Sequence, residues 1–253
     1  MKDIIFAMAL RNVKINYLRS VLAAVGITIG IISIASMGML GTNMTGSVKD
    51  QLSGMANKLS VNAYTGKGGG GGFGPSSSDN LTKAQYQNIK KIASKFGYVY
   101  GLHSIRDKVK KGKDSWNTNV YGIEISTMKT VLNNLTSGGY PSSDNSVLIG
   151  PTFASDNGFQ VGSQFTLGSK GVKVAGIIET RGFTIDMNTD NAVVVTKSLF
   201  ESMYGAKDEF NEANIVLDNI DDLSTAETAI TSQMNRREQT VRIQESSRIA
   251  SSI

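Results

Sequence analysis

The stretch VLAAVGITIGIISIASMGML, residues Val21 to Leu40, holds twenty residues without a charge, an amide side chain or a proline. An α-helix rises about 1.5 Å per residue, so this stretch covers about 30 Å, the thickness of the hydrocarbon core of a bilayer. A single helix satisfies its own backbone hydrogen bonds in lipid. The stretch therefore predicts one transmembrane helix near the N-terminus, at residues 21–40.

Basic residues predominate before this helix. The twenty preceding positions hold Lys2, Arg11, Lys14 and Arg19 with Asp3, and the twenty following positions hold Lys49 and Lys58 with Asp50. Basic flanks stay in the cytoplasm. The N-terminus is therefore predicted to be cytoplasmic at the cell membrane, and the remainder of the chain to be extracytoplasmic.

Three other interpretations of the apolar stretch fit it less well. A cleaved secretory signal has an apolar region of only about 7–15 residues and a shorter leader. A pilin-like helix carries an acid just inside its apolar run, and this run has none. A buried core helix is disfavoured by the length of the run and by its one-sided basic flank. A true span is the preferred interpretation.

Composition narrows the possible functions. The net charge of +5 in 253 residues is too mild and too scattered to indicate nucleic-acid binding. The chain has no cysteine, which excludes disulfides, thiolate chemistry and zinc–cysteine sites. Asn43, Asn80 and Asn134 each begin an N-x-T sequon, whose glycosylation depends on the organism.

The segments that flank the span show helical periodicity. Residues 1–20 place Phe6, Leu10, Val13 and Tyr17 on one stripe, which predicts an amphipathic helix at the inner membrane interface. Residues 41–58 are predicted to form a stalk helix. Its expected partner-facing residues recur with gaps of four, three and four: Val48, Leu52, Met55 and Leu59.

The span itself carries a G-x-x-x-G pattern. Gly26 and Gly30 would allow another helix to approach backbone to backbone in lipid, where small residues favour association. The alternative is that glycine is simply frequent in membrane helices. The hypothesis of helix packing at Gly26 and Gly30 is retained.

Residues 59–243 are predicted to form a mixed α+β extracytoplasmic domain, because helical and strand patterns interleave and hairpins occur among them. Residues 66–78, GKGGGGGFGPSSS, predict a flexible loop; the order of a phosphate-binding loop is absent. The turn-rich residues 136–145 predict a break between two subdomains. Residues 244–253 are expected to begin a second stalk helix. The alternation of apolar and polar residues at 59–64 predicts a strand. The strands and helices expected after it are helix 82–96, strands 98–107 and 115–124, helix 125–135, strand 146–150, helix 151–157, strands 164–167 and 172–179, strand 192–196, helix 197–204, strand 213–217, helix 224–236 and strand 241–243.

No motif for catalysis or metal binding is present. His103 is the only histidine and lies in a predicted strand without a G-x-S-x-G context, which predicts a structural or surface side chain. Asp186 and Asp190 lie in RGFTIDMNTD, and Asp218, Asp221 and Asp222 near another turn. Neither group follows a calcium-loop pattern, so both are expected to be solvated turn acids, with no catalytic residue, metal site or cofactor site in the chain.

Four passages, in this order, resemble the MacB-type, or FtsX-like, permeases of ABC transporters, specifically their N-terminal half. They are ALRNVKINYLRSVLAAVGITIGI at the start, SVKDQLSGMANKLSVNAY after the span, SVLIGPTFASDNGFQVGSQFTLGSKGVKVAGIIE, and NAVVVTKSLFESMYG. The third passage resembles the periplasmic core of that family.

The resemblance implies a non-catalytic permease subunit that dimerises, with itself or with a paralogue, and works with a separate ABC ATPase. ATP and Mg²⁺ would then bind to that partner, and the stalk would transmit movement to the outer domain for efflux, lipoprotein release or related envelope work. Arg11, Lys14 and Arg19 become candidates for lipid or ATPase contacts, and a further envelope protein is a possible partner.

Two departures from the family pattern are present. A Gly-Arg pair is common before the SVLIG-like strand, whereas this chain has Gly139 and Tyr140, so no role of that arginine is transferred. Family members continue with three further membrane helices, whereas this sequence stops at Ile253, which predicts a fragment of a permease. Three more apolar runs in the gene would support this interpretation.

The alternative of a different class is a single-span, membrane-anchored binding or adhesion module without a transport role, which a natural stop codon after Ile253 would favour. An exported hydrolase is a third, weaker hypothesis. Turnover of peptide or ester substrates by the outer domain would support it.

Overall fold

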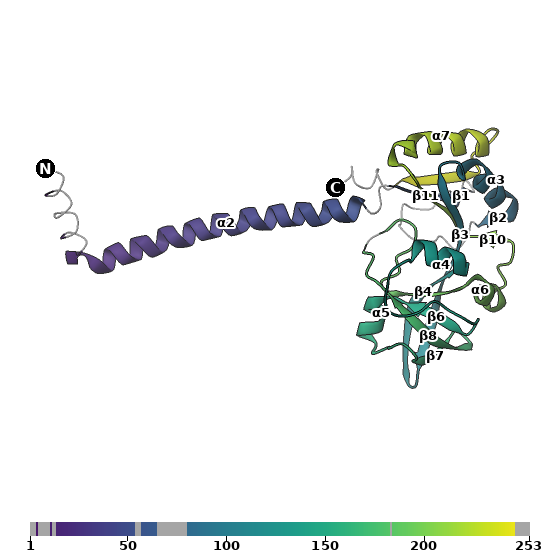
Figure 1. The fold of residues 1–253 in the computed structure, drawn as a ribbon, viewed down its shortest axis with the longest axis horizontal. Coiled ribbons are helices and arrows are strands. Elements are labelled where there is room, and N and C mark those ends of the chain that lie inside the picture. The colour runs from purple at the N-terminus through teal and green to yellow at the C-terminus, as the bar shows by residue number, and fades with distance from the viewer. Residues whose placement is uncertain are drawn as a thin grey trace. The chain divides into compact units, whose positions relative to one another are not determined.

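The structure is a computed structural model that describes residues 4, 11, 14–53, 57–64, 80–182 and 184–245. It comprises two units, residues 1–50 and 51–253, each considered by itself (Figure 1). Several predicted features lie wholly or largely outside the described residues: the amphipathic helix at 1–20, Met55, the loop at 66–78 and the second stalk helix.

The first long element is helix α2, Tyr17–Ser53, which covers the predicted span and continues through Gly41 and Gly46. Its segment Tyr17–Met39 is long and apolar enough to cross a membrane, and it is the one such helix within the described residues. The hydroxyl of Thr28 donates a hydrogen bond of 2.8 Å to the carbonyl of Ala24. The helix therefore satisfies this polar side chain within itself.

The prediction that Leu59 belongs to the partner face of the stalk is wrong, whereas the strand predicted at 59–64 is confirmed. Helix α2 ends at Ser53, and Leu59 belongs to strand β1, Lys58–Ala63, where its side chain is completely buried. β1 lies between β11, Glu212–Leu217, and β12, Val241–Glu245, and is antiparallel to both. Tertiary burial on one face of this strand, not a helical seam, accounts for the apolar residue at this position.

The first part of the core domain, here called the helix-covered lobe, is an antiparallel sheet in the order β12–β1–β11–β3. Strand β3, Gly97–Lys111, contributes its first half to this sheet. Helices α3, Lys83–Ala93, and α7, Leu223–Met234, lie over one face (Figure 1). The buried core here contains Leu59, Val61, Ile89, Ile92, Val99, Ile215 and Ile230.

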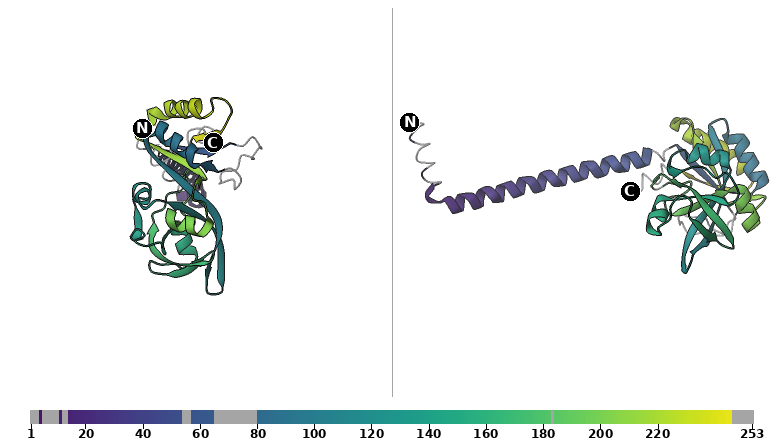
Figure 2. Two further views of the ribbon diagram at one scale, coloured as in Figure 1. Left: turned by 90° about the vertical axis from the view of Figure 1, so that its right-hand side faces the viewer. Right: turned by 60° about the horizontal axis from the view of Figure 1, so that its bottom comes forward.

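The second half of β3 belongs to a closed ring of strands, here called the barrel lobe. β3 pairs with β4, Asp114–Ile123, and the ring continues through β9, Ala192–Thr196, β6, Ser146–Ile149, and β8, Lys170–Ile178. Strand β7, Gln164–Leu167, closes it by pairing with both β8 and β3. The views in Figure 2 show the long β3–β4 hairpin reaching from the helix-covered lobe to the far end of the barrel lobe.

Helices cover both faces of the barrel's central strand. All five residues of β9 are buried. On one face, Val193 and Val195 pack in a core with helices α5, Pro151–Asp156, and α6, Lys197–Tyr204. On the other face, Val194 packs in a separate core with helix α4, Ile125–Val131. Two short strands pair with each other: β2, Leu81–Thr82, and β10, Glu209–Phe210. The remaining short elements are strand β5, Leu135–Gly138, and the 3-10 turn Ile220–Asp222.

Local signals set several boundaries. The hydroxyl of Thr82 accepts a hydrogen bond from the Gln85 backbone and the Gln85 side chain accepts one from the Thr82 backbone, which forms the capping box at the start of α3. Gly205 ends α6 with a φ of +74°, a conformation that favours glycine. The start of α3 and the end of α6 agree with the helices predicted at 82–96 and 197–204, although α3 ends at Ala93.

The predicted α+β class is confirmed, with two differences inside the core. The helix predicted at 125–135 ends at Val131, and Leu135 instead begins strand β5. The predicted subdomain break at 136–145 is wrong, because β5 and β6, which flank it, both pair with β8. The lobes instead divide along β3, which each of them shares.

Candidate functional site

The candidate site begins where the chain enters the core domain. The backbone N–H of Leu217 donates to the carbonyl of Asn57 at 2.7 Å, and the Asn57 side chain donates to the carbonyl of Leu217 at 3.1 Å. These two hydrogen bonds hold the residue before β1 against the end of β11. The next residue, Lys58, is the first residue of β1.

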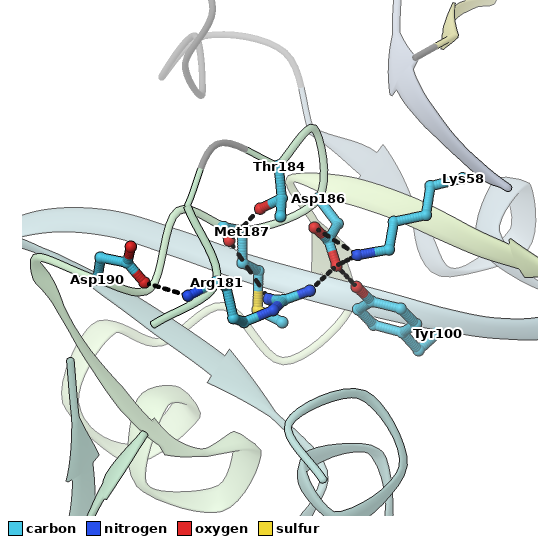
Figure 3. A network of polar contacts seen from close by, with 7 residues as sticks. All are labelled: Lys58, Tyr100, Arg181, Thr184, Asp186, Met187 and Asp190. Carbon is cyan, nitrogen blue, oxygen red and sulfur yellow. Dashed lines mark hydrogen bonds and ion pairs between the residues drawn. The ribbon is translucent and has the colours of Figure 1, made fainter. Parts of the chain in front are cut away.

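Lys58 forms a buried ion pair with an acid of the barrel lobe's 179–191 connection (Figure 3). The Lys58 Nζ lies 3.3 Å from Oδ2 of Asp186, and the Asp186 side chain is only 1% exposed. The same oxygen accepts hydrogen bonds of 2.9 Å from the Tyr100 hydroxyl and from Nη2 of Arg181. One carboxylate thus joins β1, β3 and the connection between β8 and β9.

The charge state of Asp186 follows from its neighbours. Burial by itself would raise the pKa of this carboxyl, but the positive charges of Arg181 and Lys58 outweigh burial and hold the pKa well below its usual range. Asp186 is therefore ionised at neutral pH. Removing it would leave two cations in a largely buried environment, which is strongly unfavourable.

A second acid attaches the same connection to the barrel lobe. Asp190 accepts hydrogen bonds from the backbone N–H groups of Arg181 and Gly182, at 2.8 and 2.9 Å. Its own carbonyl accepts from the backbone of Thr152 and Phe153, at the start of α5. The connection is therefore attached to the barrel lobe at Asp190 and to the helix-covered lobe at Asp186.

The expectation that Asp186 and Asp190 are solvated turn acids is wrong. Asp186 is buried by its three side-chain partners, and Asp190 serves as a hydrogen-bond acceptor for backbone that would otherwise be unpaired. Asp218 and Asp221 are exposed, as expected. Within the described residues no group of three or more potential metal ligands occurs.

A further buried carboxyl lies on the same face of the sheet. Glu212 on β11 accepts a hydrogen bond of 3.0 Å from the hydroxyl of Ser60 on β1. Burial raises its pKa to about 7, and no cation forms an ion pair with it in the described part of the chain. Unlike Asp186, Glu212 is therefore about half protonated near pH 7.

A stack of aromatic rings forms a second link between the lobes. His103 on β3 lies between Phe210 and Phe200, with ring centroids 4.8 and 5.3 Å away. Tyr86 of α3 extends the stack beyond Phe210, and Tyr204 of α6 extends it beyond Phe200. His103 is completely buried, which supports its predicted structural role. Burial, together with the positive charge of Lys197, lowers the pKa of His103 to about 4.

The residues proposed from the sequence lie mainly on α2. Gly26 and Gly30 face open space there, since an added Cβ would meet no atom within 4 Å. Arg11, Lys14 and Arg19 are exposed, and Val48 and Leu52 lie on α2.

Sequence reasoning missed Lys58, Tyr100 and Arg181. The available signal was an arginine five residues before an aspartate within one turn-rich segment, RGFTIDMNTD. That spacing indicated an internal ion pair but not its burial, because the Lys58 and Tyr100 partners come from distant strands.

The architecture is that of a mixed α+β core domain joined to one candidate membrane span, and comparison with known proteins gives its family. Residues 20–233 match the model of the MacB-like periplasmic core domain. The chain therefore belongs to this family, which confirms the resemblance to MacB-type ABC permeases.

Relatives and solved structures agree with this assignment. An uncharacterized ABC transporter permease of Methanocaldococcus jannaschii is 27% identical over 237 residues, which cover 92% of this chain and 59% of that protein. The macrolide export ATP-binding/permease protein MacB of Chlorobium luteolum is 23% identical over 197 residues, 74% of this chain and 30% of that protein. The chain thus spans less than two thirds of the length of these relatives.

Two solved structures share the fold. The periplasmic region of MacB from Actinobacillus actinomycetemcomitans has a TM-score of 0.59 at 15% identity, covering 79% of this chain and 94% of that one. The extracellular domain of the ABC-type transporter YknZ from Gram-positive bacteria has a TM-score of 0.53 at 11% identity, covering 75% and 100%. At these identities the likeness shows the fold alone.

Proposed function

We propose that this chain is the N-terminal part of a permease subunit that transmits ATP-driven movement of a separate ATPase to an extracytoplasmic core domain. The observation that carries the proposal is the family match across residues 20–233, which includes both the candidate span and the core. ATP and Mg²⁺ would bind to the partner ATPase. The N-terminus would be cytoplasmic, with Arg11, Lys14 and Arg19 near lipid headgroups or that ATPase.

The Lys58–Asp186 pair supports a role of the core in receiving movement. Lys58 follows the end of α2 by five positions, and its side chain is held by the barrel lobe's connection. A displacement of β1 would therefore act on both lobes, rather than on the helix-covered lobe alone. A rigid element with two arrangements is the physical link that such coupling requires.

The experiment uses the complete permease that contains this chain, purified with its ATPase and reconstituted in proteoliposomes. We expect the ATPase to co-purify and its turnover to depend on the permease. Gly26→Leu with Gly30→Leu should weaken permease dimerisation and ATPase stimulation, because bulky side chains prevent close helix approach in lipid. A matched control, Ile27→Leu with Ile31→Leu, keeps the apolar surface and should leave both unchanged.

Two outcomes would contradict the proposal. If no ATPase co-purifies and none is stimulated, the single-span anchored module becomes the better account. If the glycine variants dimerise and stimulate normally, Gly26 and Gly30 have no packing role. Efflux and lipoprotein release are separated by assaying drug accumulation and lipoprotein localisation in cells that lack the permease.

A further inference from the structure

A groove of about 500 Å³ lies on the barrel lobe where the β3–β4 turn meets β7 and β8. Its polar lining consists of Lys110, Lys111, Lys173, Asn145, Gln164 and Thr166. None of the described residues that line it is acidic. The groove therefore has the character of a site for a negatively charged, hydrogen-bonding ligand.

The strand register explains why these side chains gather on one side. Lys110 lies opposite Thr166, Thr166 lies opposite Gly171, and Gln164 lies opposite Lys173, so all five residues share the outer face of adjacent strands. The alternate residues face the barrel interior and are buried: Val109, Leu167, Phe165 and Val172. Gly171 lacks a side chain in the middle of this surface, and an added Cβ there would meet no atom within 4 Å. The hollow is thus produced by a glycine between polar neighbours.

The positive charge around the groove is not neutralised internally. Lys108, Lys110, Lys113, Lys170 and Lys173 make no ion pair with any residue that the structure describes. Among nearby acids, Asp107 accepts a hydrogen bond of 2.6 Å from the Tyr204 hydroxyl, and Asp114 and Asp156 are exposed. The lysines therefore outnumber the acids at this end of the barrel lobe.

One lysine of the groove is held in place by the protein. Nζ of Lys111 donates a hydrogen bond of 3.1 Å to the carbonyl of Gly158 and lies 4.5 Å from the centre of the Phe159 ring. Lys110 and Lys173 are exposed and face solvent from strands separated only by β7. The residue across β7 from Lys110 is Gly171, and Lys173 lies two residues further along β8. The backbones of Lys110 and Lys173 are therefore about 12 Å apart, at about 4.8 Å per strand and about 3.4 Å per residue.

We propose that this groove binds an extended acidic segment of another protein. In an extended chain, carboxylates four residues apart lie on the same face and are separated by about 13 Å, which the side chains of Lys110 and Lys173 can match. The amides of Asn145 and Gln164 and the hydroxyl of Thr166 can hydrogen-bond the main chain of such a segment. The match of spacing, charge and amide groups favours a peptide over an apolar ligand.

The position of the groove leaves it accessible. The groove lies at the Lys111 end of β3. The other end of β3, at Gly97, pairs with Leu217. Leu217 is hydrogen-bonded to Asn57, where the chain enters the core. The 15 residues of β3 separate these points by about 50 Å. This binding does not depend on ATP-driven movement, so the proposal stands or fails separately from the proposed function.

The experiment measures binding of fluorescein-labelled hexaglutamate to the full chain in a non-ionic detergent, by fluorescence anisotropy. Lys110→Ala with Lys173→Ala should weaken binding about tenfold, because two charge contacts are lost. Lys90→Ala with Lys91→Ala removes the same charge from exposed positions on α3 and should leave the affinity unchanged. Gly171→Glu should abolish binding by filling the hollow with an acid, while circular dichroism shows unchanged folding.

The opposite results would overturn the proposal. Equal weakening by the α3 variants would mean that net charge alone attracts the peptide. Normal binding by Gly171→Glu in a folded protein would mean that the peptide does not enter the groove. Tight binding of polyphosphate or a sulfated polysaccharide, with hexaglutamate unbound at the same salt concentration, would assign the groove to a different class of ligand and contradict a peptide partner.

Discussion

Lys58 and Asp186 are 128 residues apart in the chain, yet the Lys58 Nζ lies 3.3 Å from the Asp186 carboxylate. Arg181 and Tyr100 donate hydrogen bonds to the same oxygen of that carboxylate, Oδ2. This arrangement makes one buried acid the common partner of both lobes of the core. Lys58, which contacts this acid from the helix-covered lobe, follows the end of α2 by five positions in the sequence.

Asp186→Asn should destabilise the core by about 3–5 kcal/mol, because it leaves the charges of Lys58 and Arg181 buried without a counter-charge. The free energy of unfolding is measured by urea titration of the detergent-solubilised chain, with Trp116 fluorescence as the probe. Asp208→Asn provides the control, since the Lys83–Asp208 pair is exposed and its loss should have little effect. Equal stability of Asp186→Asn and the parent would show that the ion pair does not hold the lobes together.

Glu212 should make the core less stable as pH rises. Its pKa in the folded state is about 7, above the ordinary value of 4.5, so the protonated form is favoured by folding. Stability from this group is fully present below pH 4.5 and is lost as pH rises through 7, by on the order of 3 kcal/mol. Urea midpoints at pH 5 and pH 8 measure this slope. Glu212→Gln imitates the protonated side chain and should remove this dependence of stability on pH. An unchanged slope in that variant would assign the effect to another group.

His103 should act in the opposite direction. Its folded-state pKa of about 4 lies below the ordinary 6.5, so folding favours the neutral ring. The contribution of His103 to the free energy of unfolding is fully present above pH 6.5 and is lost as pH falls towards 4, by on the order of 3 kcal/mol. His103→Leu removes the titrating ring and should flatten this acid limb, as measured by thermal unfolding between pH 4 and 7. Persistence of the limb in that variant would exclude His103 as its source.

Gly122→Ala should destabilise the barrel lobe by about 1–3 kcal/mol, because overpacking forces side chains out of position. A Cβ at Gly122 would lie 2.6 Å from both Cβ and Cγ of Phe200, whose ring stacks with His103. Gly171→Ala is the matched control, since its Cβ would lie in open space. Phe200→Leu should partly rescue Gly122→Ala in urea unfolding. If the two glycine variants are equally stable, close packing at Gly122 is not limiting.

The sequence alone determined the features that depend on neighbouring residues. The apolar run from Val21 to Leu40 predicts a helix because local composition and length suffice for that inference. The ranges 82–96 and 197–204 predict the start of α3 and the end of α6, because a helix cap involves residues within one turn. The interleaved patterns were sufficient for the α+β class.

Only the tertiary structure decided which distant segments meet. Leu59 fitted both a helical spacing with the stalk and a strand at 59–64, and pairing with β11 and β12 places it in β1. Asp186 resembled a solvated acid until β1 and β3 brought Lys58 and Tyr100 to it. Closure of the barrel by β7 likewise placed Lys110 beside Thr166. Such contacts depend on sheet order and register, and local periodicity carries no information about either.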